Sequence, residues 1–133
     1  HVVVRKSSRS LQLIRNGETF ANYRIALGFA PNGHKLRDSD GRTPEGVYWI
    51  DRRNPRSAFH LSLGISYPNA ADIARARALG FDPGGNIFIH GEPNSGEYAR
   101  GTDWTAGCIA VTNPEIEEIW ATVPNGTRIT LLA

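Results

Sequence analysis

The sequence predicts a mainly β fold, a sandwich or barrel of short strands with two short helices. Short segments that are β-branched or alternate apolar with polar residues recur along the chain, separated by turn residues such as Asn, Gly and Pro. Only residues 70–79 and 113–123 have the composition and caps of helices. With 133 residues the chain is long enough to bury a core, and we expect residues 1–133 to form one domain.

Three strands are predicted at the start of the chain, at residues 2–4, 11–15 and 19–26. The first is a run of valines, and the other two alternate in polarity. Asn16 and Gly17 lie between the second and third strands, and both residue types tolerate positive φ, so we expect a hairpin turn there. These strands should form an opening meander.

Two more strands are predicted in the middle of the chain, after a loop at residues 28–41. Residues 43–46 read as a tight turn because they combine Pro and Gly, and residues 47–50 alternate as a strand does. The Asn-Pro pair at 54–55 is expected to interrupt the chain before a further strand at 59–63.

Both helices carry recognisable ends. Residues 70–79 are rich in Ala, the best helix former, with Asn69 as the expected cap and Gly80 as the expected end. In the second helix Asn113 is the expected cap, and Pro114 suits the first helical position.

The last three strands are predicted at residues 87–89, 109–111 and 127–132. His90 ends the first of them, and Cys108 directly precedes the second. A thiol at the start of one strand and an imidazole at the end of another can meet in space. This is the arrangement of a Cys–His nucleophile pair.

Small residues precede the single cysteine. Ala106 and Gly107 let the backbone bend tightly, and Thr105 to Cys108 present consecutive N–H groups, as an oxyanion hole requires. The segment between His90 and Cys108 is polar and rich in Gly, which suits an exposed loop over a cleft. The alternative is that the cysteine is a small buried apolar residue without chemistry.

Composition excludes several classes of function. The net charge of +2 comes with scattered arginines, whereas a nucleic-acid-binding protein shows a dense basic patch with interleaved aromatic residues. One cysteine allows no internal disulfide, and no apolar run has membrane-spanning length. We expect a monomer that binds neither nucleic acid nor a cofactor.

Two possible metal sites lack the expected ligand spacing. Asp38 and Asp40 lie in one loop, but their spacing does not fit a helix–loop–helix calcium site, and no Glu follows in register. A zinc site would have to use ligands whose spacing matches no short zinc pattern. These ligands would be His34, His60, His90 and Cys108.

The motifs together resemble the L,D-transpeptidase catalytic domain, also called the YkuD-like domain. Residues 89–91 (Ile-His-Gly) and 105–109 (Thr-Ala-Gly-Cys-Ile) follow the family pattern of a His, a spacer, Ser or Thr, and then Gly-Cys. Residues 41–46 match the family turn R-T-P-x-G, and residues 59–60 and 65–69 resemble the segment that lines its groove. The resemblance covers most of the chain, with its blocks in the expected order.

This resemblance implies a role for each residue of the motif. Cys108 would be the nucleophile, His90 the base, and the Gly91 carbonyl the group that orients His90. Backbone N–H groups at Ala106, Gly107 and Cys108 would stabilise the oxyanion. The implied substrate is a peptidoglycan stem tetrapeptide in the periplasm or another extracytoplasmic space, cleaved before its terminal D-alanine through a thioester. Transfer to an amine would form a 3–3 cross-link in cell-wall biogenesis, a process that affects cell shape.

Five side chains are candidates for substrate contact, each with a plainer interpretation. Tyr67 and Trp104 are expected to line the groove, although aromatic residues often belong to a core or rim. Thr105 is expected near the thiol or as part of the turn, and His60 near the substrate or hydrogen-bonded within its strand. Arg100 is a candidate for binding a carboxylate by two hydrogen bonds, although exposed loop arginines usually bind nothing specific.

Two positions depart from the family pattern. Ala106 stands where His is usual, and Ala110 stands where many members have Arg. The departures indicate a subgroup with its own substrate use. The alternatives are hydrolysis, as an L,D-carboxypeptidase or in release of a peptidoglycan-linked lipoprotein or cross-links, and a non-catalytic peptidoglycan-binding module.

Overall fold

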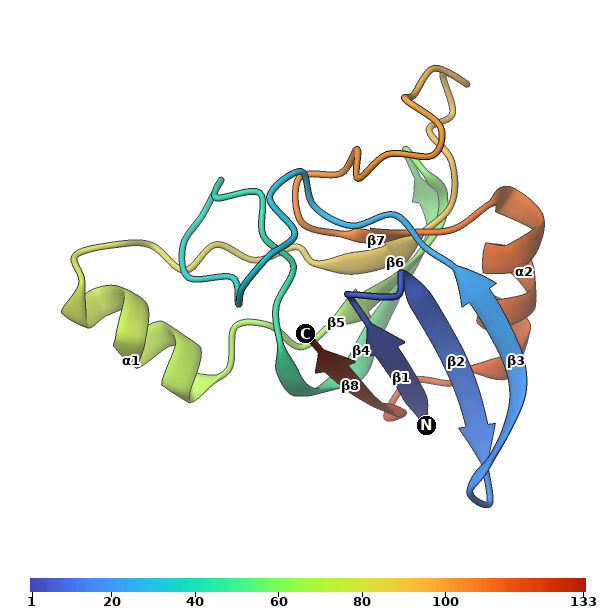
Figure 1. Cartoon of the computed structure of the whole chain (residues 1–133), viewed down its shortest axis with the longest axis horizontal. Helices are drawn as coiled ribbons and strands as arrows, with labels where there is room; N and C mark the ends of the chain where they lie inside the picture. The colour runs from blue at the N-terminus through green and yellow to red at the C-terminus, as the bar shows by residue number, and fades with distance from the viewer.

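The computed structural model describes all 133 residues, which form one curled eight-stranded sheet and two helices (Figure 1). The helices are α1 (Ala70–Ala78) and α2 (Asn113–Thr122). The strands are β1 (Val2–Arg5), β2 (Ser10–Arg15), β3 (Glu18–Arg24), β4 (Gly46–Ser57), β5 (His60–Ile65), β6 (Phe88–His90), β7 (Ile109–Ala110) and β8 (Arg128–Leu132).

The sheet closes on itself although its strands form a linear order, β3-β2-β1-β8-β4-β5-β6-β7. The C-terminal β8 lies in the middle, parallel to β1 and antiparallel to β4. Beyond β3, Ala26 forms a bridge with Ala110 of β7, and Gly28 forms one with Thr105. The two ends of the strand order therefore meet, and the predicted class, mainly β with two short helices, is confirmed in the form of one curled sheet.

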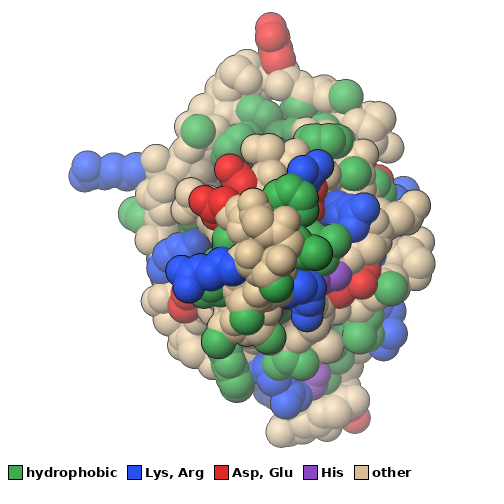
Figure 2. All heavy atoms as spheres, turned by 90° about the vertical axis from the view of Figure 1, so that its left-hand side faces the viewer, with side chains coloured by type: hydrophobic (Ala, Val, Ile, Leu, Met, Phe, Trp, Pro, Cys, Tyr) green, Lys and Arg blue, Asp and Glu red, His purple; other side chains and the backbone are tan.

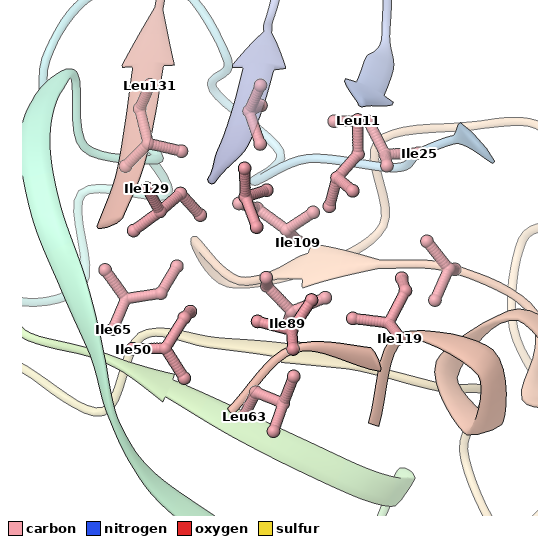
Figure 3. Packing of buried hydrophobic residues seen from close by; sticks show 14 of the residues in the cluster. Leu11, Ile25, Ile50, Leu63, Ile65, Ile89, Ile109, Ile119, Ile129 and Leu131 are labelled. Carbon is pink, nitrogen blue, oxygen red and sulfur yellow. The ribbon is translucent and has the colours of Figure 1, made fainter. Parts of the chain in front are cut away.

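The core occupies the inside of the curl. Ile89 of β6 and Ile109 of β7 are fully buried neighbours in the register, and Figure 3 places them between Leu63 and Ile25. Side chains alternate between the two faces of a strand. Because Ile89 and Ile109 point into the core, the residues next to them in the chain point to the opposite face, where the functional site lies.

The two helices are anchored differently. Helix α2 buries Ile116 and Ile119 against the core, whereas the buried side chains of α1 are Asp72 and Ala76. In Figure 1, α1 stands at the left, on the side of the molecule away from α2. Apolar packing alone therefore does not hold α1.

A polar network attaches α1 instead. Asp72 is 5% exposed, and its carboxylate accepts the Tyr48 hydroxyl at 2.6 Å, His34 Nε2 at 2.8 Å and the Asn69 N–H at 3.1 Å. Glu45 N–H donates to His34 Nδ1, so the proton of this imidazole lies on Nε2. Asn69 and Asp72 form a capping box, which satisfies the first turn of the helix.

Two elements differ from their predicted form. Strand β4 continues through Asn54 and Pro55 to Ser57, so the expected break there is wrong. The β4–β5 register shifts between Asn54 and Ser57, and an irregular ladder tolerates a proline without an N–H. The cap of α2 is Thr112 rather than Asn113, and the Glu115 carboxylate accepts the Thr112 N–H at 2.9 Å.

Basic side chains are dispersed on the face that carries α1. Figure 2 shows Lys and Arg there among apolar and acidic groups, without one continuous basic patch. Neither helix is long and apolar enough to cross a membrane.

Candidate active site

His90 ends β6, Cys108 directly precedes the parallel neighbour β7, and the two residues lie on the same face of the sheet. His90 pairs with Ala110. Two residues earlier on each chain segment, the same register places Cys108 beside Phe88. The Phe88 N–H donates to Cys108 Sγ at 3.4 Å, and the thiol donates to the Asn86 carbonyl at 3.5 Å. No hydrogen bond joins the thiol to His90, so the sulfur must turn away from Asn86 before the imidazole can take its proton.

The His90 imidazole is held in its neutral form. Its Nδ1 lies 2.8 Å from the Gly91 carbonyl, which can only accept, so Nδ1 carries the proton and Nε2 keeps its lone pair. The side chain is 2% exposed, and this burial lowers the pKa of His90 to about 4, against a smaller opposing effect of the Gly91 carbonyl. The imidazole is therefore uncharged at neutral pH.

Aromatic rings account for the burial of His90. The Phe59 ring stacks on the imidazole with 4.2 Å between centroids, and the Trp104 ring lies 5.6 Å from it. Tyr98 contacts Trp104 from the other side at 5.1 Å. Trp104, a candidate for lining the groove, therefore lies beside His90. The stacking of Phe59 had no signal in the sequence beyond its place in a groove-like segment.

Burial also affects the Cys108 thiol. It raises the pKa of the Cys108 thiol, while the Phe88 N–H and the charges of Lys35 and Arg52 act in the opposite direction. With the pKa of the thiol raised and that of His90 lowered, the resting pair is a neutral thiol and a neutral imidazole. This favours proton transfer during attack over a preformed thiolate–imidazolium pair.

The turn before Cys108 is shaped by Thr105. Its hydroxyl donates to the Cys108 carbonyl at 2.7 Å and accepts the Gly107 N–H at 3.2 Å. The Gly107 N–H, a predicted oxyanion donor, is therefore already occupied. The N–H groups of Ala106 and Cys108 have no hydrogen-bond partner within the chain and remain available. Gly107 has φ +137°, and a Cβ there would lie 2.9 Å from the Arg42 carbonyl oxygen.

The R-T-P turn (residues 42–44) supports the turn at residues 105–108 through hydrogen bonds. The fully buried Thr43 hydroxyl donates to the Gly107 carbonyl at 2.8 Å and accepts the Gly28 N–H at 3.1 Å. A Cβ on Gly28 would lie 2.1 Å from the Gly41 carbonyl oxygen, so three passes of the backbone meet here without side chains between them. Lys6 Nζ binds the Thr43 carbonyl at 2.8 Å and fixes the R-T-P turn to the end of β1.

A surface pocket of about 640 Å³ adjoins the site on the side of Trp104 and Ala110, although neither Cys108 nor His90 lines it. Asp103, at its edge, accepts hydrogen bonds of 3.0, 3.2 and 2.7 Å from Arg9. Burial raises the pKa of Asp103, but this ion pair and the Leu27 N–H outweigh it and lower the pKa. The Arg9–Asp103 pair thereby ties the loop that carries Trp104 to the β1–β2 turn.

Three candidate substrate contacts have partners other than Cys108 and His90. Tyr67 is 3% exposed, and its hydroxyl donates to the Pro83 carbonyl at 2.8 Å, so it is a core residue and not a groove wall. His60 pairs with Glu117 of α2 at 2.9 Å. Arg100 is highly exposed over the Tyr98 ring and makes no contact with Cys108 or His90.

The candidate metal ligands do not gather into one cluster. No three His, Cys, Asp or Glu side chains converge with the spacing of a metal site. Asp40 accepts Lys35 Nζ at 2.9 Å together with the N–H groups of Leu36, Arg37 and Arg42.

Comparisons with known proteins agree on the family. The model of the L,D-transpeptidase catalytic domain, YkuD, matches residues 1–131. YafK from Escherichia coli (strain K12), a protein assigned provisionally to the L,D-transpeptidases by its name, is 32% identical over 126 residues, 90% of this chain and 45% of YafK. YkuD from Bacillus subtilis (strain 168), named in the same way, is 26% identical over 98% of this chain and 65% of its own length. This chain therefore spans only part of these relatives.

Solved structures show the same architecture. The helical cell shape determining protein Pgp2 from Campylobacter jejuni superposes with a TM-score of 0.79 at 26% identity, over 98% of this chain and 46% of that chain. An L,D-transpeptidase from Mycobacterium smegmatis, 13% identical, shares the fold with a TM-score of 0.65, over 99% of this chain and 58% of that chain. The chain belongs to the L,D-transpeptidase catalytic domain family.

Proposed function

We propose that this protein is a cysteine L,D-transpeptidase that acts on peptidoglycan stem tetrapeptides in the cell envelope. The observation that carries the proposal is the shared sheet face of Cys108 and His90, with His90 Nδ1 committed to the Gly91 carbonyl and Nε2 left as the base. Family membership supports the substrate class.

In the first step Cys108 attacks the carbonyl carbon of the third stem residue. The thiol turns from Asn86, and His90 Nε2 takes its proton as the carbon–sulfur bond forms. The carbonyl oxygen becomes negative and is met by the free N–H groups of Cys108 and Ala106. Each such donor can be worth about 3 kcal/mol in the transition state.

The intermediate then collapses to a thioester. The imidazolium of His90 returns its proton to the nitrogen of the terminal D-alanine, which leaves as an amine. Because burial among aromatic rings disfavours charge on His90, the imidazolium is a strong acid and gives up this proton readily.

Release of the acyl group repeats the chemistry in reverse. An amine of a second stem peptide attacks the thioester, His90 takes a proton from that amine, and the thiol is restored when His90 protonates the departing sulfur. The product is a 3–3 cross-link. Water in place of the amine would give hydrolysis by the same thioester.

Mass spectrometry of the products tests the proposal. Tetrapeptide muropeptides are incubated with the protein and a D-amino acid, beside Cys108→Ala and a Ser95→Ala control in an exposed loop. Transfer would be supported if wild-type protein and Ser95→Ala release D-alanine and form exchange products or dimers, and Cys108→Ala does not. If only hydrolysis products form, the acceptor of the acyl group is water and not an amine. No reaction, with an active family member working in parallel, would contradict the proposal and favour a peptidoglycan-binding module.

A further inference from the structure

An arginine lies on the same face of the sheet as the nucleophile and in the same cross-strand row. Arg52 of β4 pairs with Gly64 of β5, and Gly64 pairs with Phe88 of β6. The parallel β6–β7 register then places Cys108 beside Phe88. One row thus crosses β4, β5 and β6 and ends just before β7; it contains Arg52, Gly64, Phe88 and Cys108. We call it the Cys108 row.

A β-bulge puts Arg52 on this face. Ile50 pairs with Ile65, and both are fully buried in the core. The register shifts between Ile50 and Arg52, so Asp51 is an extra residue in β4. In a regular strand, residues 50 and 52 would point to the same face, and Arg52 would then point toward the core as Ile50 does. Bulges re-aim side chains in this way.

Gly64 leaves the space through which Arg52 crosses the sheet. A Cβ on Gly64 would lie 2.3 Å from Arg52 Cγ and 2.8 Å from its Cζ. The side chain therefore lies flat across β5, and its guanidinium sits over the Phe88 ring, 4.8 Å from the centroid. Because Phe88 is the cross-strand neighbour of Cys108, the positive charge of the guanidinium lies on the side of Arg52 that faces Cys108.

One edge of the guanidinium is free. Nη1 binds the Asp51 carboxylate at 2.6 Å and the Ile65 carbonyl at 3.4 Å. Nε and Nη2 have no hydrogen-bond partner, and the side chain is 39% exposed. Nε–H and Nη2–H point in parallel and form the fork that binds both oxygens of a carboxylate.

We propose that Arg52 binds a carboxylate of the substrate beside Cys108. The inference rests on the proposed function and names a binding residue that the family motif does not include. A stem tetrapeptide offers this group in two places: the terminal carboxylate of the leaving D-alanine, and the side chain of a third residue that carries a carboxylate. Both present the same planar group to the guanidinium.

Substitution of Arg52 tests the contact. Arg52→Gln should lower kcat/KM on an acidic tetrapeptide by roughly ten- to a hundredfold, as expected for loss of a charge-assisted pair of hydrogen bonds. Arg52→Lys should recover only part of this loss, because an ammonium cannot offer two parallel N–H groups. Arg56→Gln, on the same strand and exposed, is the matched control and should keep wild-type kinetics. Urea unfolding checks that each variant is folded.

Two altered peptides distinguish the sources of the carboxylate. One ends in D-alaninamide, and the other has a third residue without a side-chain carboxylate. Wild-type protein should lose activity on the peptide that lacks the recognised group, and Arg52→Gln should cause no further loss on that peptide. An equal loss on every peptide, or no loss at all, would overturn the inference.

Binding separates this inference from the proposed chemistry. Tetrapeptide affinity is measured in the Cys108→Ala protein with and without Arg52→Gln, so no turnover is needed. A higher Kd with Arg52→Gln would support the contact even if the wild-type protein failed to transfer the acyl group. An unchanged Kd beside active wild-type protein would refute the Arg52 contact and leave the cysteine mechanism standing.

Discussion

At the scale of single residues, the burial of His90 predicts the pH range of the proposed reaction. The imidazole must be neutral to take the thiol proton, and burial lowers its pKa to about 4. The acid limb of kcat/KM should therefore fall near pH 4 and not near the ordinary value of about 6.5. A pH profile with a soluble tetrapeptide measures this. A limb at the ordinary value would show that His90 is solvated in the working enzyme.

The same residue links stability to pH. Between about pH 6.5 and about pH 4, His90 is protonated in the unfolded chain but remains neutral in the folded protein. The free energy of unfolding therefore falls as pH falls through this window. The whole shift corresponds to about 3 kcal/mol. His90→Gln removes the proton site, so its unfolding free energy should depend less on pH than that of wild type. Urea unfolding at about pH 7 and about pH 4.5 gives both slopes, and identical slopes would contradict the expectation.

Residue identity shows where sequence reasoning ends. His90 and Cys108 could be predicted because the chemistry lies in a short pattern: an imidazole at one strand end and small residues before a thiol at another. The core position of Tyr67 could not be chosen over a groove position, because nothing local distinguishes an aromatic residue of the core from one of a groove. Arg52 could not be found, because its approach to Cys108 depends on a bulge and on the register of three other strands.

At the scale of elements, the turn before Cys108 is held by close backbone contact. Gly107→Ala places a methyl group 2.9 Å from the Arg42 carbonyl oxygen at φ +137°. The variant should lose about 1–3 kcal/mol of stability through strain and most of its activity, because the Cys108 N–H is displaced.

A second glycine isolates this contact. Gly96 also has positive φ, +76°, but a Cβ there meets nothing within 4 Å. Gly96→Ala should cost about 1 kcal/mol and keep its activity. Urea unfolding and product formation, measured on both variants, compare the positions. Equal activity loss at the two positions would show that backbone conformation, and not the Arg42 contact, is responsible.

Strands and helices were predicted with uneven success for a physical reason. The β6 and β7 strands and both helices match their predicted positions within a few residues, because period and capping are local signals. The continuation of β4 through Pro55 was missed because the bulged ladder, which tolerates a proline, is made by pairing with β5.

At the scale of the whole molecule, the chain ends hold the sheet together. β1 and β8 are parallel neighbours, and β8 also pairs with β4 of the site-bearing half. The bridge between Ala26 and Ala110 joins the opening meander to the strand after Cys108. No sequence pattern indicates such pairings, since they join segments about a hundred residues apart. They make the site depend on both ends of the chain.

This dependence predicts that the site is lost together with the fold. Ile129 of β8 is fully buried and pairs with Val2 and Tyr48, so Ile129→Ala should cost about 2–5 kcal/mol. Leu132→Ala, on the same strand but 38% exposed, should cost much less. Far-ultraviolet circular dichroism, tryptophan fluorescence and residual activity are followed in urea for both variants and for wild type. Because β8 lies between the two halves of the sheet, the three signals should change at one midpoint in each protein, shifted furthest for Ile129→Ala. If activity were lost at a clearly lower urea concentration than circular dichroism, the site would open independently of the sheet, and the chain ends would not control it.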